Sequence, residues 1–380
     1  MWENPPEVRI MNNIMQWLEV VEDLRQPWKV KHLLKDIIAL VFFASLANAD
    51  EWTAIYLFGI TNEKFLRKYL ELPYGIPSHD TIERVFAMVS PEYLQAFRKR
   101  WDEVMSGNGG ERIKRILGID GKTQRGNATA EQKANHIVSA VDERGFCIGE
   151  VLTDEKSNEI TAIPELLNAL NIKGNIITID AMGCQTNIAA IIREKHADYV
   201  LALKGNQGTL NEEAKLYFDD PELLAKCAYT KFLEKAHGGV EKREYWQTDD
   251  IRWLPQLKEW EGLKSIIMTR NTITKNNTTT TETRYFISSL PKDVENAAYA
   301  IRSHWMVESY HWHLDVTFRE DANHTAEKDA AYNLNIMKKM ALNTLKLVDV
   351  SNIIKRASIK SKRYIMCVNF EKYFDMLVNL

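Results

Sequence analysis

The sequence predicts an α/β protein: a mixed sheet with flanking helices forms the core, an all-helical domain precedes it, and a β-rich insertion interrupts it. Residues 1–105 carry apolar side chains at helical spacing. A turn-rich break, Ser106–Gly110, then separates them from segments predicted in the order β-β-β-α-β-α-β. Between about 208 and 290 the pattern changes again, to a short helix followed by strands.

Length and composition indicate two or three domains with a large buried core. The chain has 380 residues, of which 45% are hydrophobic and 27% charged, as in globular proteins that do not span membranes. The longest apolar run, Ile37–Ala47, is too short to cross a bilayer, and we see no signal-peptide pattern. Four cysteines without CxxC spacing favour a reducing cytoplasm and argue against a zinc–thiolate site.

The net charge of −3 gives no general attraction to nucleic acid, but the C-terminal end is locally basic. Between Ala331 and Arg363 the only acid is Asp349, and the bases are Lys338, Lys339, Lys346, Lys355, Arg356, Lys360, Lys362 and Arg363. We therefore interpret residues 350–380 as a basic C-terminal tail.

Residues 1–108 are predicted to form one helical domain. Its apolar segments are Ile14–Leu24, Leu33–Leu46, Trp52–Phe58, Phe65–Leu72, Ile82–Val89 and Tyr93–Val104. Ser78-His79-Asp80 has the letters of a catalytic set, but three consecutive side chains do not usually form such a relay. The stretch Asp80–Glu83 after Pro77 predicts a capped helix start instead.

Two predicted strands each end in an aspartate. Ile113–Ile119 is followed by Asp120, and Asn175–Ile179 is followed by Asp180. The other elements of this region are a hairpin at His136–Val141 and Phe146–Leu152, helices Ile160–Leu170 and Ile188–His196, and the strand Tyr199–Leu203. In such a sheet the fourth strand can pair beside the first, which would bring Asp120 and Asp180 together.

The β-rich insertion, at about 208–290, is predicted to contain an acidic helix near Leu210–Phe218 and then strands. These strands are Lys242–Trp253, Leu263–Thr272 and Thr279–Ser288. The polar, β-branched stretch Asn271–Thr283 predicts a hairpin with an exposed tip. Helical spacing returns at Val294–Arg302 and again at Ala330–Leu347.

A further group of polar side chains gathers on the predicted helix Ile301–Asp321. At 3.6 residues per turn, one face would carry His304, Glu308, His311, Trp312 and Asp315. Apolar anchors would hold this helix against a larger body, namely Met306, Val307, Leu314, Val316 and Phe318. A solvated helix with half-buried indoles explains the stretch equally well, unless distant acids meet Glu308.

Asp120, Asp180 and Glu308 together predict an acidic site. Two carboxylates about 4 Å apart repel by roughly 4 kcal/mol at an effective dielectric near 20, so three of them need a compensating cation. Carboxylates, water and phosphate oxygens are the usual ligands of Mg²⁺ at phosphoryl-transfer sites. Either aspartate alone is better explained as a turn residue after a strand.

Long motifs over nearly the whole chain resemble insertion-sequence DDE transposases of the H-repeat-associated type. Those of the catalytic region are IDGKT (119–123), TDEKSNEITAIPELL (153–167), ITIDAMGCQ (177–185), YVLALKGNQG (199–208) and HWMVESYHWHLDVTFRED (304–321). DLRQPWKVKHLLKDIIAL (23–40) and GIPSHDTIERVF (75–86) are similar to the N-terminal associated domain of that family.

The resemblance implies a ribonuclease H-like catalytic domain at 109–349, interrupted by the insertion, and DNA binding by residues 1–108. By position, the catalytic acids and metal ligands fall on Asp120, Asp180 and Glu308. The implied activity is Mg²⁺-dependent cleavage at insertion-sequence ends, with two ions per site and Mn²⁺ as the alternative, followed by 3′-hydroxyl strand transfer. The implied partner is double-stranded DNA, at the terminal inverted repeats and in the target, and a homodimer on DNA is left open. We expect a cytoplasmic protein that joins the nucleoid when bound to DNA and has no membrane partner.

Three positions depart from the family pattern. His311-Trp312 is one residue closer to Glu308 than usual. Gly239 stands where an arginine is expected, and Asp315 stands where transposases with a Tyr-Arg-Glu-Lys signature carry a lysine. None of these departures removes a catalytic acid, so they bear on efficiency and end specificity rather than on reaction class.

Five further side chains are candidates for DNA contacts. Lys122 and Lys204 each follow a strand end and could contact phosphate, although a solvated turn lysine fits as well. Arg302 has the bidentate geometry that suits phosphate. His304 and Trp305 could pack beside an unpaired terminal base, but core packing is the default for Trp305.

Other functions fit parts of the sequence. A hydrolytic nuclease would use the same core without strand transfer. A decayed element protein would bind DNA without cutting it, although the intact acids argue against this. A zinc hydrolase with His304, Glu308 and His311 as ligands is permitted by the helical spacing, but the sequence has no other His/Cys cluster.

Overall fold

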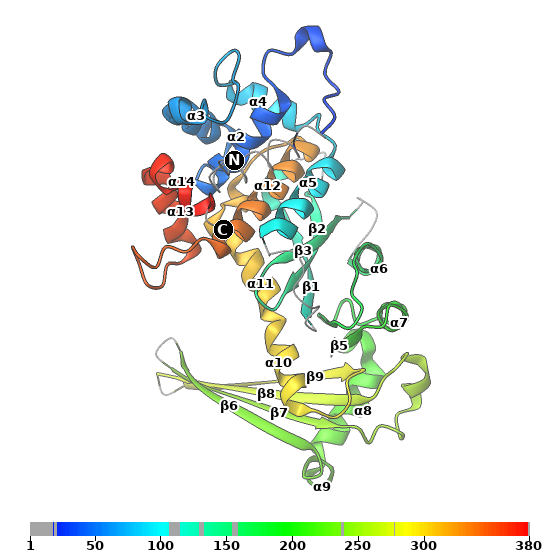
Figure 1. Ribbon diagram of the computed structural model, residues 1–380. Helices are drawn as coiled ribbons and strands as arrows, with labels where there is room; N and C mark the ends of the chain where they lie inside the picture. Colours follow the sequence, from blue (N-terminus) through cyan, green and yellow to red (C-terminus); the bar gives the residue numbers. More distant parts are fainter. Residues whose placement is uncertain are drawn as a thin grey trace, which may run out of the picture. The chain divides into compact units, whose positions relative to one another are not determined.

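The computed structural model describes residues 18, 21–105, 115–128, 133–153, 159–236, 239–276 and 278–378. The break predicted at Ser106–Gly110 therefore lies outside the described residues. The chain forms two compact units, whose elements are labelled in Figure 1. Unit 1 comprises Met1–Glu111, Thr123–Asn135 and His311–Leu380, and unit 2 comprises Arg112–Lys122 and His136–Tyr310.

Unit 2 is built on a nine-stranded sheet with the order β3-β2-β1-β4-β5-β9-β8-β7-β6. Its first five strands are β1 (Ile116–Thr123), β2 (His136–Asp142), β3 (Cys147–Leu152), β4 (Ile176–Ile179) and β5 (Asp198–Leu203). β4 lies between β1 and β5 and is parallel to both, whereas β2 and β3 form an antiparallel hairpin. The predicted pairing of the fourth strand beside the first is confirmed.

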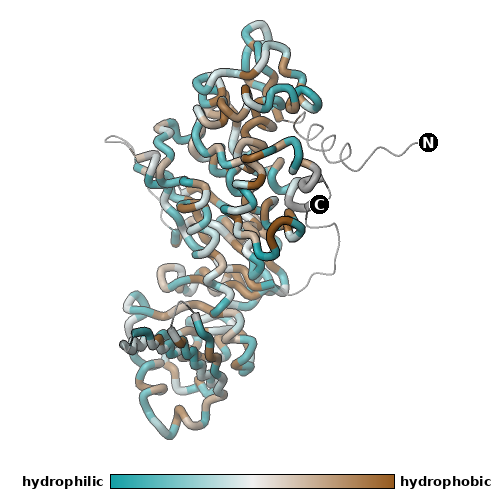
Figure 2. The backbone as a smooth tube through the Cα atoms, turned by 90° about the vertical axis from the view of Figure 1, so that its left-hand side faces the viewer, coloured by the Kyte–Doolittle hydropathy of each residue, from teal (hydrophilic) through white to brown (hydrophobic). Residues whose placement is uncertain are grey.

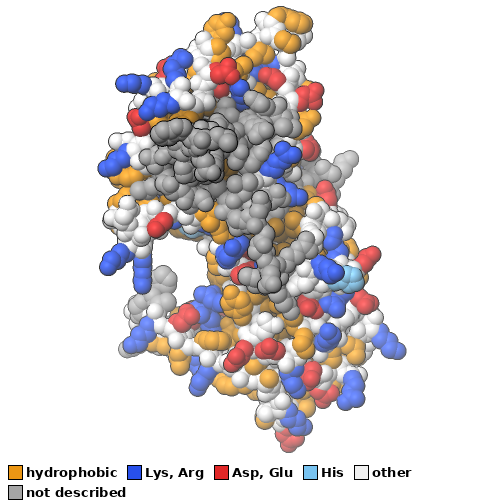
Figure 3. All heavy atoms as spheres, in the orientation of Figure 1, with side chains coloured by type: hydrophobic (Ala, Val, Ile, Leu, Met, Phe, Trp, Pro, Cys, Tyr) orange, Lys and Arg blue, Asp and Glu red, His pale blue; other side chains and the backbone are white. Residues whose placement is uncertain are grey.

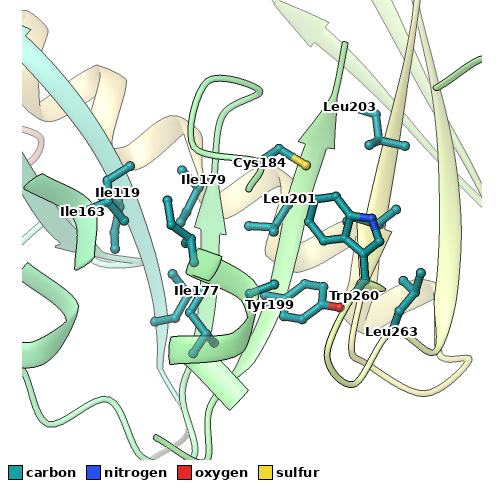
Figure 4. Packing of buried hydrophobic residues seen from close by; sticks show 14 of the residues in the cluster. Ile119, Ile163, Ile177, Ile179, Cys184, Tyr199, Leu201, Leu203, Trp260 and Leu263 are labelled. Carbon is teal, nitrogen blue, oxygen red and sulfur yellow. The ribbon is translucent and has the colours of Figure 1, made fainter. Parts of the chain in front are cut away.

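Helices cover both faces of the parallel strands. On one face, α6 (Glu159–Ala169) and α7 (Thr186–Glu194) pack against Ile119, Ile179 and Leu201, which lie side by side across β1, β4 and β5 (Figure 4). On the other face, Ala297 and Ala300 of α10 (Val294–Ser303) pack in a second cluster with residues of the same strands. All four residues of β4 are buried, as expected of a parallel strand covered on both sides.

The insertion extends the same sheet, because β9 pairs antiparallel with β5. Its elements are α8 (Gly208–Asp219), α9 (Pro221–Leu224), β6 (Ala228–Ala236), β7 (Gly239–Thr248), β8 (Ser265–Lys275) and β9 (Thr278–Ser288). The predicted hairpin at Asn271–Thr283 is confirmed: its last pair joins Lys275 to Thr278, and Asn276 takes a left-handed φ of 49° in the turn. β6 was not predicted, because AYTKFLEKA is rich in helix-forming residues and this edge strand leaves Phe232 and Leu233 exposed.

Unit 1 is helical. Its helices are α2 (Leu34–Leu46), α3 (Trp52–Leu66), α4 (His79–Phe86), α5 (Pro91–Met105), α12 (Lys328–Leu347), α13 (Ile359–Val368) and α14 (Phe370–Val378). α12 is buried along Ala330–Leu345, and α2, α4 and α5 pack around it. Trp101 of α5 donates its indole N–H to Thr344 of α12 at 2.8 Å, so the indole is buried without losing its hydrogen bond.

Two details of the N-terminal prediction were tested. A capped helix start is confirmed here, but it lies earlier than the predicted Asp80–Glu83: α4 begins at His79, and the backbone N–H of Thr81 donates to Oγ of the cap residue Ser78. The separate helix predicted at Phe65–Leu72 is wrong: α3 continues to Leu66 and ends there, and Leu72 has a left-handed φ of 45° that no helix accommodates. Most of the first predicted segment, Ile14–Leu24, lies outside the described residues.

The C-terminal segment packs into unit 1. Phe370 and Phe374 of α14 contact Phe43 and Phe65 of the N-terminal helices. Three of the eight bases counted between Ala331 and Arg363 are buried, namely Lys338, Lys339 and Arg363. Counting bases along the sequence therefore overstated the exposed positive charge, which here falls on Lys355, Arg356 and Lys360.

Arg363 is a structural residue of unit 1. Its guanidinium donates to both carboxylate oxygens of Asp50, at 2.6 and 3.2 Å, and to the carbonyl of Ser45 at 2.9 Å. The same group lies 4.0 Å from the ring centre of Phe318. Since all of these partners belong to unit 1, Arg363 serves its core.

Apolar residues are distributed through both units, as the colouring in Figure 2 shows. Among the described helices, none has the length and apolar character to span a membrane. Acidic and basic side chains are interspersed on the face drawn in Figure 3.

Candidate functional site

The two predicted aspartates follow register partners of the sheet. Ile119 of β1 pairs with Ile179 of β4 in parallel, so Asp120 and Asp180 occupy neighbouring positions across the two strands. Asp180 follows β4 as predicted, but β1 continues to Thr123, so the prediction that its strand ends at Asp120 is wrong. Oδ1 of Asp180 accepts hydrogen bonds from the backbone N–H groups of Met182 and Gly183, at 3.0 and 3.3 Å. The turn after β4 therefore fixes the orientation of the Asp180 carboxylate.

The helix that carries Glu308 is anchored to β4. α10 ends at Ser303, the chain turns at His304, and α11 (Trp305–Trp312) follows. Nδ1 of His304 lies 3.0 Å from Oγ1 of Thr178, which lies two residues before Asp180. Thr178 thus links the strand of one predicted acid to the start of the helix that carries another.

The single helix predicted at Ile301–Asp321 is wrong. Besides the turn at His304, a π-helical segment, His313–Thr317, follows α11 and changes the residue spacing, so Asp315 loses α-helical register with Glu308. His311 is buried whereas Glu308 and Trp312 are exposed, so the predicted polar stripe is not one face. Among the predicted anchors Val307, Leu314 and Phe318 are buried, Met306 is half-buried and Val316 is exposed.

Asp120, Asp180 and Glu308 line one cavity of about 750 Å³ within unit 2. Four of the five candidate DNA-contact residues line it too, namely Lys204, Arg302, His304 and Trp305. The fifth, Lys122, is not among the lining residues and is only 9% exposed, so it is not a solvated turn lysine. Trp305 is 47% exposed, and the default of core packing is wrong for it.

Burial in the cavity disfavours the charged forms of Asp180 and His304. Burial raises the pKa of Asp180, and the negative charge of Asp120 raises it further, while the hydrogen bonds from Gly183 and Met182 oppose the shift. Burial also lowers the pKa of His304, although both aspartates favour its protonated form. Two carboxylates in this setting gain from a bound cation.

A divalent metal fits the chemistry of these donors. Carboxylate oxygens are the hard ligands that Mg²⁺ and Mn²⁺ take. In the described part of the chain, no three His, Cys, Asp or Glu side chains stand close enough together to hold a metal ion. The three acids therefore share a cavity without forming a closed ligand set. The alternative zinc set of His304, Glu308 and His311 gains no support either, because it is not such a group.

The insertion adds to the cavity a charged face that was not predicted from the sequence. Arg243 of β7, Arg270 of β8 and Arg284 of β9 all line it. Arg243 pairs with Glu241 and Glu234, and Arg284 pairs with Glu282. The register of the strands places Arg243 and Arg284 on the same face of the sheet. Arg284 pairs with Thr269 and Arg243 pairs with Asn271, and these two partners are two residues apart on β8. Successive side chains of a strand point to opposite faces, so EKREY and TETRYF each indicate which residues share a face with the arginine. Only the register shows that the two arginines lie on the same face of the sheet.

Comparison with known proteins settles the family. The model of the transposase DDE domain matches residues 111–344, and that of the DDE_Tnp_1-associated domain matches residues 15–102. The chain belongs to the DDE transposase family. It is 40% identical over 370 residues to "Putative transposase YncI" of Escherichia coli O157:H7, which covers 94% of this chain and 93% of that relative. It is 39% identical over 346 residues to "H repeat-associated putative transposase YhhI" of Escherichia coli strain K12, covering 88% of this chain and 90% of that relative.

The match also defines the fold of this DDE transposase. The α/β class with a ribonuclease H-like catalytic core, expected from the resemblance, is confirmed for the region that holds Asp120, Asp180 and Glu308. The helices α2 to α5 of the transposase fall within or at the edge of the associated domain.

Proposed function

We propose that this transposase cuts DNA at the ends of its insertion sequence and joins the freed 3′ hydroxyl to target DNA, and that Asp120, Asp180 and Glu308 close around a divalent metal to do so. One observation carries the proposal: these three acids, distant in the sequence, line a single cavity within one unit. Two Mg²⁺ ions, or Mn²⁺ in their place, would compensate their charge. When bound, they would activate the attacking oxygen and steady the leaving oxygen.

The protein itself holds the ligands. Asp120 lies within β1 and Asp180 directly follows the paired strand β4, and two backbone N–H groups orient Asp180. Glu308 comes from α11, whose start is anchored by the hydrogen bond between His304 and Thr178. Glu308 thus comes from a helix and not from the sheet. Its position relative to the two aspartates depends on the hydrogen bond between His304 and Thr178.

The cavity wall supplies groups that suit DNA. Lys204 and Arg302 are exposed cations on this wall and would bind phosphates beside the acids. Trp305, about half exposed, offers a face on which an unpaired base would stack. In unit 1, the N-terminal helices and the exposed Lys355, Arg356 and Lys360 would add phosphate contacts.

The test uses the full chain and a labelled duplex that carries the terminal inverted repeat of its own element. Incubation with Mg²⁺, with Mn²⁺ or with a chelator should give a nick with a 3′ hydroxyl only when the metal is present, followed by joined product when target DNA is added. Cleavage in the chelator would refute the metal role. Nicking without joining would indicate a hydrolytic nuclease, and tight binding without nicking a decayed element protein.

A further inference from the structure

The motif TDEKSNEITAIPELL contains an acid, Glu159, that the proposed function does not use. Glu159 is the first residue of α6, and its Oε1 lies 3.0 Å from Nε2 of His136, the first residue of β2. Both side chains are mostly buried, at 15% and 26% exposed. Two residues from separate elements thus form one polar pair inside unit 2.

This pair rests on the backbone of Gly121, the residue after Asp120. A Cβ atom built on Gly121 would lie 2.2 Å from Oε1 of Glu159 and 2.6 Å from Nε2 of His136, so any side chain there would collide with the pair. The φ of Gly121 is outside the left-handed region. Glycine is therefore required here by close approach and not by backbone conformation.

We propose that the His136–Glu159 pair is a clamp that positions Asp120 by bearing on Gly121 from behind. Successive side chains of a strand point to opposite faces, so a group packed on Gly121 supports the strand at the point where Asp120 leaves it on the other side. His136 is itself fixed, because Thr153 donates its N–H and its hydroxyl to the carbonyl of His136, at 2.8 and 3.0 Å. This inference rests on the proposed role of Asp120.

The pair also lies within electrostatic reach of the site. The charge of Glu159 contributes to the raised pKa of Asp180, after the larger effects of burial and of Asp120. Glu159 and His136 are not among the cavity-lining residues. They are therefore positioning residues, and we assign them no contact with DNA or metal.

The experiment compares three substitutions on one helix in the full chain. Glu159→Ala removes the contact with Gly121, Glu159→Gln keeps an oxygen of the same shape without the charge, and Glu165→Ala changes an exposed acid of α6 as the matched control. We measure the rate of end cleavage, Mg²⁺ binding by calorimetry and amide hydrogen exchange of the peptide 116–123.

Glu159→Ala should cleave DNA about 10- to 100-fold more slowly, as expected of a displaced reacting group, and should bind Mg²⁺ more weakly. Its amide hydrogens should exchange faster in the peptide 116–123 but not in the β5 peptide 198–203. Glu159→Gln should recover most of the loss, and Glu165→Ala should match the parent. Parent-like cleavage and exchange in Glu159→Ala would overturn the clamp. Glu159→Gln as slow as Glu159→Ala would also overturn it, in favour of an effect of charge alone.

A double-mutant comparison keeps the clamp testable if a single variant fails to fold. Gly121→Ala forces a methyl group against the pair and should slow cleavage. Because Glu159→Ala makes room for that methyl, the two substitutions combined should cost less than the sum of their separate effects. Additive effects would show that the groups do not touch. If the parent itself does not cut DNA, the proposed function fails, but the exchange of 116–123 still decides the clamp.

Discussion

Oγ1 of Thr178 lies 3.0 Å from Nδ1 of His304, and this hydrogen bond connects β4 to the turn that begins α11. Asp180 follows Thr178 by two residues, and Glu308 follows His304 by four. This hydrogen bond joins residues close to two of the proposed metal ligands and therefore helps to fix the separation between them.

Thr178→Val should weaken this connection at nearly constant side-chain volume. It removes the hydroxyl that hydrogen-bonds to the imidazole of His304, which costs about 1 kcal/mol, and end cleavage should slow by about tenfold. Affinity for end DNA should hold. Thr178→Ser, which keeps the hydroxyl, is the matched control and should stay near the parent. Equal rates for the valine and serine variants would contradict the role of this bond.

Asp36 of α2 predicts a pH dependence of stability. Asp36 is 1% exposed, and its carboxylate accepts a hydrogen bond from the N–H of Leu72 at 2.8 Å. Burial raises the pKa of Asp36 above its ordinary 3.8, although that bond opposes the shift. Because the folded-state pKa exceeds the unfolded one, the stability from this group is present below pH 3.8 and is lost as pH rises through the folded pKa.

Asp36→Asn does not titrate and can keep an acceptor for Leu72. The free energy of unfolding of this variant minus that of the parent should therefore increase as pH rises from about 4 to 7. Urea titrations at several pH values measure this difference. A difference that stays constant or shrinks with rising pH would show that the folded-state pKa of Asp36 is not raised.

The basic residues of the C-terminal segment should separate into two classes. Arg363→Ala leaves Asp50 buried without its partner and should destabilise unit 1 by about 3–5 kcal/mol. The double variant Lys355→Ala with Arg356→Ala should leave the stability of the fold unchanged. It should weaken DNA binding and reduce the salt dependence of that binding, because fewer phosphate contacts release fewer counterions from the DNA. Thermal unfolding and DNA affinity against salt measure both. An unchanged salt slope in the double variant would exclude these two residues from DNA binding.

The tip of the β8–β9 hairpin should tolerate shortening. Residues Thr278–Glu282 are exposed, and the tip is held by cross-strand pairs such as Thr274 with Thr279. Removing the two outermost pairs while keeping residues 276 and 277 should change the unfolding temperature by no more than about 2 °C, because little surface is buried there. A large loss of stability would reveal packing of the tip.

Local patterns predicted most of the fold. Apolar spacing located α2, α5 and α12, and apolar runs followed by an acid located β1 and β4, although β1 continues past Asp120 to Thr123. Each of these signals lies within one element. The pairing of β1 with β4, which brings Asp120 and Asp180 to one edge, followed from strand order alone. The acids that line the cavity were thus accessible to sequence reasoning.

The remaining features depend on contacts between distant segments. A π-helical segment after Trp312 has no simple letter pattern, so the predicted polar stripe failed. The burial of Lys338 and Arg363 is decided by partners far along the chain, such as Asp50 for Arg363. The shared face of the arginines of β7 and β9 follows only from the register of the sheet, and the contact of Glu159 with Gly121 follows only from the tertiary structure.

The metal site itself predicts a common response from its three acids. Asp120→Asn, Asp180→Asn and Glu308→Gln should each leave DNA affinity and metal-free folding intact, since each removes a ligand and relieves like-charge repulsion. The stabilisation that Mg²⁺ gives the parent should fall in all three, and thermal unfolding with and without the ion measures it.

End cleavage by Glu308→Gln in Mg²⁺ is the most direct measurement of the account, with Glu295→Gln on the exposed side of α10 as the matched control. We predict that Glu308→Gln binds end DNA and folds like the parent but cuts at least about 10³-fold more slowly, a loss of about 4 kcal/mol of transition-state stabilisation, while Glu295→Gln cuts normally. Cleavage by Glu308→Gln near the parent rate, or unfolding of its metal-free form, would show that α11 is scaffold and that Asp120, Asp180 and Glu308 are not one site.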